Sequence, residues 1–165
     1  MTKLNNQNRR LRAGMVGGGK DAFIGAVHRM AMRLDDEVEL IAGALSKDPQ
    51  IAIESAKEFG IEKSRTHTKW QDFLEDEKKR SPEERIDFVS IVTPNFLHAP
   101  VAKAFLAAGI NVVCDKPLCL TEEEALELIS LKNKSNVVFG VTYNYTGYPM
   151  IREAKELIKE KKIGK

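Results

Sequence analysis

The chain has 165 residues, of which 42% are hydrophobic and 30% charged, and its formal net charge is +2 at pH 7. These values are typical of one globular domain with a full hydrophobic core. Because 26 basic residues are interspersed with 24 acidic ones, the sequence gives no argument for nucleic acid binding. No apolar run is long enough to span a membrane, so we expect a cytoplasmic protein.

The two cysteines predict no metal site. Cys114 and Cys119 have no histidine or further cysteine near them at zinc-ligand spacing. We therefore expect two reduced structural thiols.

The N-terminal part of the chain contains its most informative glycines. Residues 1–12 are polar and basic, and we expect a flexible tail there. A short apolar run then ends in Gly17, Gly18 and Gly19, and an amphipathic segment follows. Glycines allow backbone amides to approach a phosphate at a helix N-terminus. Five residues separate Gly19 from Gly25, three more than in the G-x-G-x-x-G fingerprint, so this pattern alone fits a phosphate loop and a plain glycine turn equally well.

The next elements alternate in type. Apolar residues at helical spacing predict a helix over 25–34 with one apolar face, formed by Ile24, Val27, Met30, Ala31 and Leu34. The apolar run 39–45 predicts a strand that is buried on both faces. Asp48-Pro49 starts a helix over 50–59 that Gly60 ends, and Trp70–Lys79 forms a charged helix.

The second half repeats this alternation. We expect strands at 87–92, 111–114 and 137–141, and helices at 98–108, 121–132 and 151–162. The sequence T-E-E-E from Thr121 is a capping box that marks one helix start.

Continuous apolar strands that alternate with helices predict a parallel sheet covered on both faces. The fold class is therefore α/β, a Rossmann-type doubly wound sheet. In this arrangement the loops after the strands meet at one sheet edge, where ligands bind. Those loops are residues 17–23, 46–48, 93–98, 115–117 and 143–145.

Residues 89–118 read V-S-I-V-T-P-N-F-L-H-A-P-V-A-K-A-F-L-A-A-G-I-N-V-V-C-D-K-P-L. This run resembles the glucose–fructose oxidoreductase, inositol dehydrogenase and rhizopine-catabolism oxidoreductase family. The hallmarks are Thr93-Pro94-Asn95 with His98, then Asp115-Lys116-Pro117, and Gly17-x-Gly19 followed by Gly25-x-x-His28. The sequence departs from the family pattern in its longer glycine loop and in Asp115, where the family commonly has glutamate.

The resemblance implies a nucleotide-binding domain over residues 13–147, and it implies that 148–165 starts the connection to a substrate domain absent from this chain. It implies an NAD(P)-dependent oxidoreductase that transfers hydride to or from a hydroxyl or carbonyl of a sugar, cyclitol or related polyol. We expect the 165-residue chain alone to be inactive, and the enzyme to be a homo-oligomer.

Lys116 is the catalytic candidate that the resemblance provides, as a positioning donor and part of a proton relay. Such a group is needed because hydride leaving a carbinol carbon must be matched by a proton leaving its oxygen. The resemblance also implies that Pro117 is cis. The implied cofactor-binding residues are Gly17, Gly19, Phe23, Ile24, Ser46, Lys47, Thr93, Pro94, Asn95, His98, Asp115, Lys116, Pro117 and Asn144.

Simpler interpretations stay open for several of these residues. Thr93-Pro94-Asn95 also fits an ordinary turn after a strand, and His98 fits a polar residue in the first turn of a helix. His28 fits packed structure better than catalysis, and the sequence offers no partner for His67.

Alternatives also stay open for the identity of the cofactor and for the class of function. Ser46 and Lys47 stand where NAD enzymes usually carry an acid for the ribose 2′-hydroxyl, so NADP is favoured slightly over NAD, although Asp48 is close by. One alternative function is a non-catalytic dinucleotide-binding module, such as a redox sensor or a subunit of a larger enzyme. A methyltransferase is disfavoured because it accounts for neither residues 93–95 nor Lys116.

Overall fold

A computed structural model describes residues 9–164 of the chain. In that range the strands are β1 (Leu11–Gly17), β2 (Val38–Ala44), β3 (Phe88–Val92), β4 (Asn111–Cys114) and β5 (Phe139–Val141). The α-helices are α1 (Phe23–Arg33), α2 (Pro49–Phe59), α3 (Trp70–Lys79), α4 (His98–Ala107), α5 (Glu122–Lys134) and α6 (Pro149–Lys159). Short 3-10 helices are η1 (Lys63–Arg65), η2 (Asn95–Leu97) and η3 (Asn144–Gly147).

All of these strands pair in parallel, in the order β2-β1-β3-β4-β5. The chain therefore forms the predicted Rossmann-type α/β sheet, with β1 in the interior. Most of the expected N-terminal tail lies outside the described residues. Its last two residues, Leu11 and Arg12, belong to β1, because their backbones pair with Val38 and Glu39 of β2.

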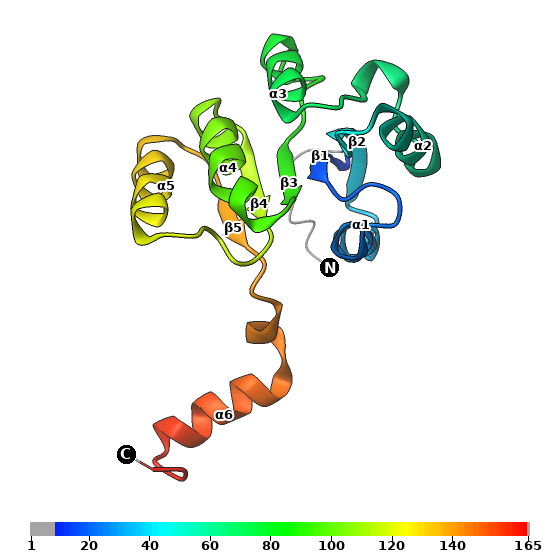
Figure 1. Ribbon diagram of the computed structural model, residues 1–165. Helices are drawn as coiled ribbons and strands as arrows, with labels where there is room; N and C mark the ends of the chain where they lie inside the picture. The colour runs from blue at the N-terminus through cyan, green and yellow to red at the C-terminus, as the bar shows by residue number, and fades with distance from the viewer. Residues whose placement is uncertain (1–8, 165) are drawn as a thin grey trace.

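Helices cover both faces of the sheet (Figure 1). His28 of α1 contacts Ser90 of β3, which places α1 on the face to which Ser90 points. Since side chains alternate along a strand, Val89 and Ile91 point to the opposite face. There they join a core cluster with Phe105 of α4 and with residues of α3 and α5. A smaller cluster under α1 and α2 includes Met15, Leu45, Ala56, Ile61 and Val92.

The apolar face expected for α1 is only partly correct. Met30 and Leu34 are 67% and 76% exposed, whereas Gly25 and His28 are the buried residues of this helix. Ile24 and Val27 instead line a cavity of about 660 Å³ beside β3 and β4. The prediction failed because Gly25, rather than a large apolar side chain, is the residue of α1 that packs against the end of β1.

The expectation that the strand over 39–45 is buried on both faces is correct only for its second half, and β5 at the other edge of the sheet is also less buried. All residues of β5 are only partly buried, as is most of the first half of β2. β2 and β5 are the outer strands of the sheet, so each has a neighbouring strand on one side only.

Gly25 allows α1 to approach the end of β1. A Cβ atom added at Gly25 would lie 2.4 Å from the Cα atom of Gly18 and 2.6 Å from its carbonyl oxygen. Both obstacles are backbone atoms, so no rotamer change relieves the overlap. The third glycine of the fingerprint, displaced in sequence by the longer loop, therefore still makes the close helix–strand contact.

Gly25→Ala should lower the free energy of unfolding by about 1–3 kcal/mol, the usual cost of overpacking a tight interior contact. The loss should appear although alanine favours a helix over glycine by about 1 kcal/mol. Urea unfolding followed by Trp70 fluorescence measures it. Gly147→Ala is the matched control, because its Cβ would meet no atom within 4 Å. Equal stability of both variants would show that the glycine contact is not tight.

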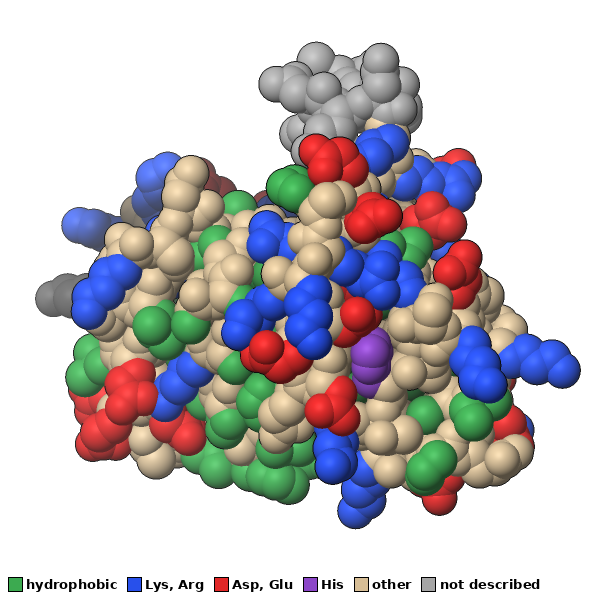
Figure 2. Space-filling view, turned by 90° about the horizontal axis from the view of Figure 1, so that it is seen from above, with side chains coloured by type: hydrophobic (Ala, Val, Ile, Leu, Met, Phe, Trp, Pro, Cys, Tyr) green, Lys and Arg blue, Asp and Glu red, His purple; other side chains and the backbone are tan. Residues whose placement is uncertain are grey.

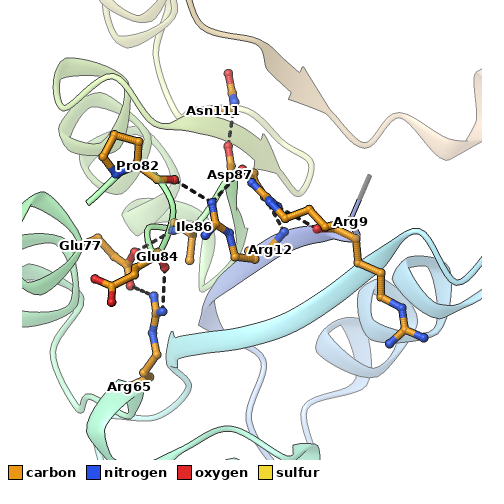
Figure 3. A network of polar contacts seen from close by, with 10 residues as sticks. Arg9, Arg12, Arg65, Glu77, Pro82, Glu84, Ile86, Asp87 and Asn111 are labelled. Carbon is orange, nitrogen blue, oxygen red and sulfur yellow. Dashed lines mark hydrogen bonds and ion pairs between the residues drawn. The ribbon is translucent and has the colours of Figure 1, made fainter. Parts of the chain in front are cut away.

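A polar network lies at the opposite edge of the sheet, where the strands begin (Figure 3). The Asp87 carboxylate accepts hydrogen bonds from the Arg9 guanidinium at 2.7 and 2.9 Å and from the Arg12 amide at 2.6 Å. Asn111 donates to the Asp87 carbonyl oxygen at 2.7 Å. Nearby, the fully buried Glu77 pairs with Arg65 and accepts from the Ile86 amide. This network ties β1, β3 and β4 together at their starts.

The network predicts a stability that depends on pH. Burial raises the pKa of Asp87, but the hydrogen bonds from Arg9 and Arg12 outweigh this effect and lower it to about 2. Because the folded pKa is depressed, the stabilisation is complete above about pH 4 and is lost as the pH falls through about 2. Asp87→Asn should therefore cost about 2 kcal/mol at pH 7 and much less near pH 2.

Urea unfolding of both proteins across this pH range measures the difference. Asp72→Asn, on the first turn of α3, is the control for a carboxylate outside this network. A stability difference at Asp87 that does not change with pH would contradict the assignment.

The surface carries mixed charge on the face that Figure 2 shows, where basic and acidic side chains are interleaved. α6 extends away from the sheet (Figure 1), and none of its described residues is buried. Among the described residues, no helix combines the length and apolarity needed to cross a membrane.

Candidate functional site

The loops that follow the parallel strands meet at one edge of the sheet, as predicted. The cavity beside α1 opens there. Its lining includes Phe23, Ile24, His28, Asp115, Lys116 and Asn144. The structure therefore brings the start of α1, the Lys116 turn and the loop after β5 to one place.

Two side chains that the sequence analysis missed brace the glycine loop. Ser55 of α2 accepts a hydrogen bond from the Lys20 amide at 2.8 Å and donates to the Ile51 carbonyl at 2.6 Å. Arg29 of α1 donates to the Gly18 carbonyl oxygen, and its guanidinium lies 3.7 Å from the centre of the Phe59 ring. Neither residue belongs to a recognisable motif, so only the fold reveals them.

The N-terminus of α1 is open to an anion. Its N-cap residue is Ala22, which makes no side-chain cap, and the first turn carries no acidic residue. The first amides of a helix have no partner within the helix, and the helix dipole favours negative charge beside them. Gly17 and Gly18 lead the chain into this turn with φ of +79° and +70°. This geometry favours a phosphate loop over a plain glycine turn.

The Ser55 contact predicts a local change in hydrogen exchange. Ser55→Ala should speed exchange of the Lys20 amide about tenfold, because the acceptor is lost while the α2 backbone stays intact. Ser135→Ala is the matched control, since Ser135 makes the same bond to the carbonyl four residues earlier in α5. Hydrogen exchange followed by NMR measures both. Unchanged protection of Lys20 in Ser55→Ala would show that Ser55 does not hold the loop.

The turn after β4 contains Asp115, Lys116 and Pro117, and the Lys116–Pro117 peptide bond is cis, as the resemblance implied. The Asp115 carboxylate accepts from the Thr142 hydroxyl at 2.6 Å and lies 3.4 Å from His28 Nε2. Burial raises the pKa of Asp115, but hydrogen bonds from Thr142, the Lys116 amide and His28 bring it below its ordinary value. An ionised carboxylate therefore stands beside Lys116.

The Lys116 side chain is exposed at the cavity. Within residues 9–164 its ammonium group has no ion-pair or hydrogen-bond partner. An ammonium group is a hydrogen-bond donor only. Lys116 can therefore donate to a molecule that enters the cavity.

His28 is buried, as expected for packed structure, but it also belongs to this site. Its Nδ1 atom lies 2.9 Å from the Ser90 hydroxyl, and its Nε2 atom faces Asp115. His67 lies elsewhere, stacked on Phe73 with Nε2 3.5 Å from the Asp76 carboxylate. No partner for His67 could be predicted, because both contacts depend on how α3 packs.

The loop after β3 places Pro94 and Asn95 at the surface, whereas the Thr93 hydroxyl is buried and has no hydrogen-bond partner among residues 9–164. His98 differs from the expectation of a cofactor contact. Its ring is 1% exposed, and its two nitrogens face the carbonyl oxygens of Thr93 and Pro117. The ring is therefore not available for a hydrogen bond to a cofactor.

The loop after β2 holds Ser46, Lys47 and Asp48. The Asp48 carboxylate caps α2 by accepting from the Ile51 amide at 3.0 Å, and the Asp48 amide donates to the Ser46 hydroxyl oxygen at 3.1 Å. Lys47 is exposed. Because the Asp48 carboxylate already caps α2, the Lys47 ammonium and the Ser46 hydroxyl are the groups in this loop that can contact a ligand.

The cysteines take no part in this site. Burial and the nearby Asp115 raise the pKa of the Cys114 thiol to about 12, so it is inert at neutral pH. Both cysteines are free thiols. Across the described residues, no group of three His, Cys, Asp or Glu side chains is placed to hold a metal ion.

Comparison with known proteins agrees with this arrangement. A family model described as an oxidoreductase family with an NAD-binding Rossmann fold matches residues 11–143. Levoglucosan dehydrogenase from Pseudarthrobacter phenanthrenivorans is 34% identical over 162 residues, which are 94% of this chain and 38% of that protein.

Two solved structures are also similar. An oxidoreductase from Sinorhizobium meliloti is 49% identical with a TM-score of 0.83, covering 94% of this chain and 43% of that one. An inositol dehydrogenase homologue from Azotobacter vinelandii, in complex with NADH and myo-inositol, is 38% identical with a TM-score of 0.88. The match covers 96% of this chain and 41% of that one. The chain thus spans about two fifths of the length of these relatives.

Proposed function

This chain belongs to the glucose–fructose oxidoreductase, inositol dehydrogenase and rhizopine-catabolism oxidoreductase family, and we propose that it binds a nicotinamide dinucleotide at the carboxyl edge of its sheet. The observation that carries the proposal is the uncapped start of α1 beside the glycine loop, on the same edge as the Lys116 turn. The donor set fits such a ligand, since helix amides suit a pyrophosphate. The buried Thr93 hydroxyl without a partner offers a further polar group there.

Each part of the edge has a distinct task in this proposal. The first turn of α1 holds the pyrophosphate, and Ser46 with Lys47 contacts the adenosine ribose. Phe23, Ile24 and Asn144, which line the cavity, enclose the nicotinamide and exclude water from it. A bound nicotinamide dinucleotide supplies hydride chemistry, which a side chain cannot.

Lys116 is the proposed catalytic residue. Its ammonium group would donate a hydrogen bond to the substrate oxygen and stabilise negative charge there, while the proton of that oxygen passes to or from solvent water and the hydride passes between the adjacent carbon and the nicotinamide. The substrate class we propose is a sugar, cyclitol or related polyol. Support comes from the relatives, one a levoglucosan dehydrogenase and another crystallised with myo-inositol.

We propose that NADP binds more tightly than NAD. Lys47 is free to pair with a 2′-phosphate and Ser46 to donate to it, whereas Asp48 is engaged in capping α2. Support for NAD also exists, because the Azotobacter vinelandii homologue was solved with NADH.

Exposed aromatic side chains support the proposal that residues 148–165 start the connection to a substrate domain, which would cover them. Tyr143, Tyr145 and Tyr148 are each at least half exposed, and Met150 and Ile151 continue this apolar surface onto α6. Exposed apolar surface of this extent is typical of a face that a partner covers.

Calorimetric titration of the 165-residue chain with NAD and NADP tests cofactor binding. We expect both to bind, with NADP about ten- to a hundredfold tighter, the range for a charge-assisted hydrogen bond. Lys47→Glu should reverse this order, and Lys63→Glu, on η1, is the control for a change of surface charge. Binding of neither dinucleotide at millimolar concentration would refute the proposed function. An NADP preference that survives Lys47→Glu would refute only the role of Lys47.

The role of Lys116 is testable in a fusion of residues 1–165 to the part of the Sinorhizobium meliloti oxidoreductase that this chain does not cover. Lys116→Ala should lower kcat about a hundredfold to ten-thousandfold, as for loss of a positioned acid–base group. Cofactor affinity should change little. Lys103→Ala, which removes an ion pair with Glu127 on the far side of the sheet, is the control. Near-normal turnover of Lys116→Ala would show that Lys116 is a structural residue of the turn and not a catalytic one.

A further inference from the structure

His98 joins two loops of the candidate site that are far apart in sequence. It is the first residue of α4, and its ring is almost completely buried. Nδ1 lies 2.6 Å from the carbonyl oxygen of Pro117, in the turn after β4. Nε2 lies 2.9 Å from the carbonyl oxygen of Thr93, in the loop after β3. One rigid ring therefore spans the two loops.

We propose that His98 is a positioning residue that holds the Lys116 turn in fixed register with the cofactor loop formed by residues 93–95. The proposal rests on the function proposed above, since it gives His98 its effect on cofactor binding through these two loops. It assigns His98 no contact with cofactor or substrate.

The surroundings of Lys116 support this role. On one side, the Asp115 amide donates to the Ile91 carbonyl at 2.9 Å, and the Asp115 carboxylate is held by Thr142. On the other side, the Pro117 carbonyl is held by His98. The backbone of Lys116 is thus fixed before and after the residue, while its side chain stays exposed and without a partner. A fixed backbone with a mobile ammonium group suits a donor that must meet a substrate oxygen.

The chemistry of the ring makes the bridge specific to histidine. Both partners are carbonyl oxygens, which only accept, so the complete bridge has an N–H on each ring nitrogen and one hydrogen bond to each carbonyl. An asparagine places an amide nitrogen near the position of Nδ1, and a glutamine places one near that of Nε2. Each substitution therefore keeps one half of the bridge and removes the other.

NMR spectra of the 165-residue chain test the bridge directly. In His98→Gln the amide resonances of Lys116 and Leu118 should shift, because the Pro117 carbonyl loses its donor. In His98→Asn the larger shifts should instead appear at the amides of Thr93 and Asn95, because the Thr93 carbonyl loses its donor. His67→Gln, at a partly buried histidine whose ring stacks on Phe73 of α3, should change neither set. Shifts confined to α4 in both His98 variants would overturn the proposal.

Calorimetry adds the functional readout. The Kd for NAD should rise about tenfold in each His98 variant, as for the loss of one well-formed hydrogen bond, and should stay within twofold in His67→Gln. Wild-type affinity in both His98 variants would overturn the role in positioning. Failure of the wild-type chain to bind NAD would refute the proposed function instead, and the amide shifts would still decide whether the bridge exists.

A measurement on the unsubstituted chain covers the case in which the variants do not fold. The ring nitrogens of His98 should shift when NAD binds, although the buried ring makes no contact with it, and those of His67 should not. Unmoved His98 resonances in the NAD-bound chain would overturn the proposal.

Discussion

The close approach of α1 to the end of β1 is the constraint on which the candidate site depends. Gly25 has no side chain, so the helix lies against the backbone of Gly18. This contact places the uncapped amides of the first turn at the carboxyl edge of the sheet. Arg29 from the same helix and Ser55 from α2 then hold the loop between them. The N-terminus of α1, where we propose that the pyrophosphate binds, is thereby fixed without any side chain at the glycines.

The two edges of the sheet have different physical characters. At the edge where the strands begin, the carboxylates of Asp87 and Glu77 are paired within the protein and tie the strands together, although the Nε atoms of Arg12 and Arg65 have no partner among the described residues. At the opposite edge, the Lys116 ammonium and the Thr93 hydroxyl have no partner among the described residues. An ammonium group exposed at a cavity suits ligand binding, because a ligand can supply the missing hydrogen bond. The paired carboxylates and the proposed ligand site therefore lie at opposite ends of the strands.

Local signals predicted most of the fold. The alternation of apolar runs and helical periodicity gave the elements within a few residues, and Asp48, Gly60 and Thr121 marked helix ends correctly. The loops of the site were also predicted, because parallel strands place their ends together. Long-range contacts could not be predicted. The braces Ser55 and Arg29, the His28–Asp115 pair and the burial of His98 depend on how helices pack, and the apolar face of α1 was misassigned because a glycine faces the sheet.

The central claim is that a nicotinamide dinucleotide lies across the edge formed by the glycine loop and the Lys116 turn. A crystal structure of the chain grown with NAD tests it most directly. We predict pyrophosphate density against the first-turn amides of α1 and nicotinamide density in the cavity lined by Phe23, Lys116 and Asn144. A dinucleotide bound elsewhere on the protein, or an α1 N-terminus without phosphate in crystals that contain bound NAD, would contradict the account.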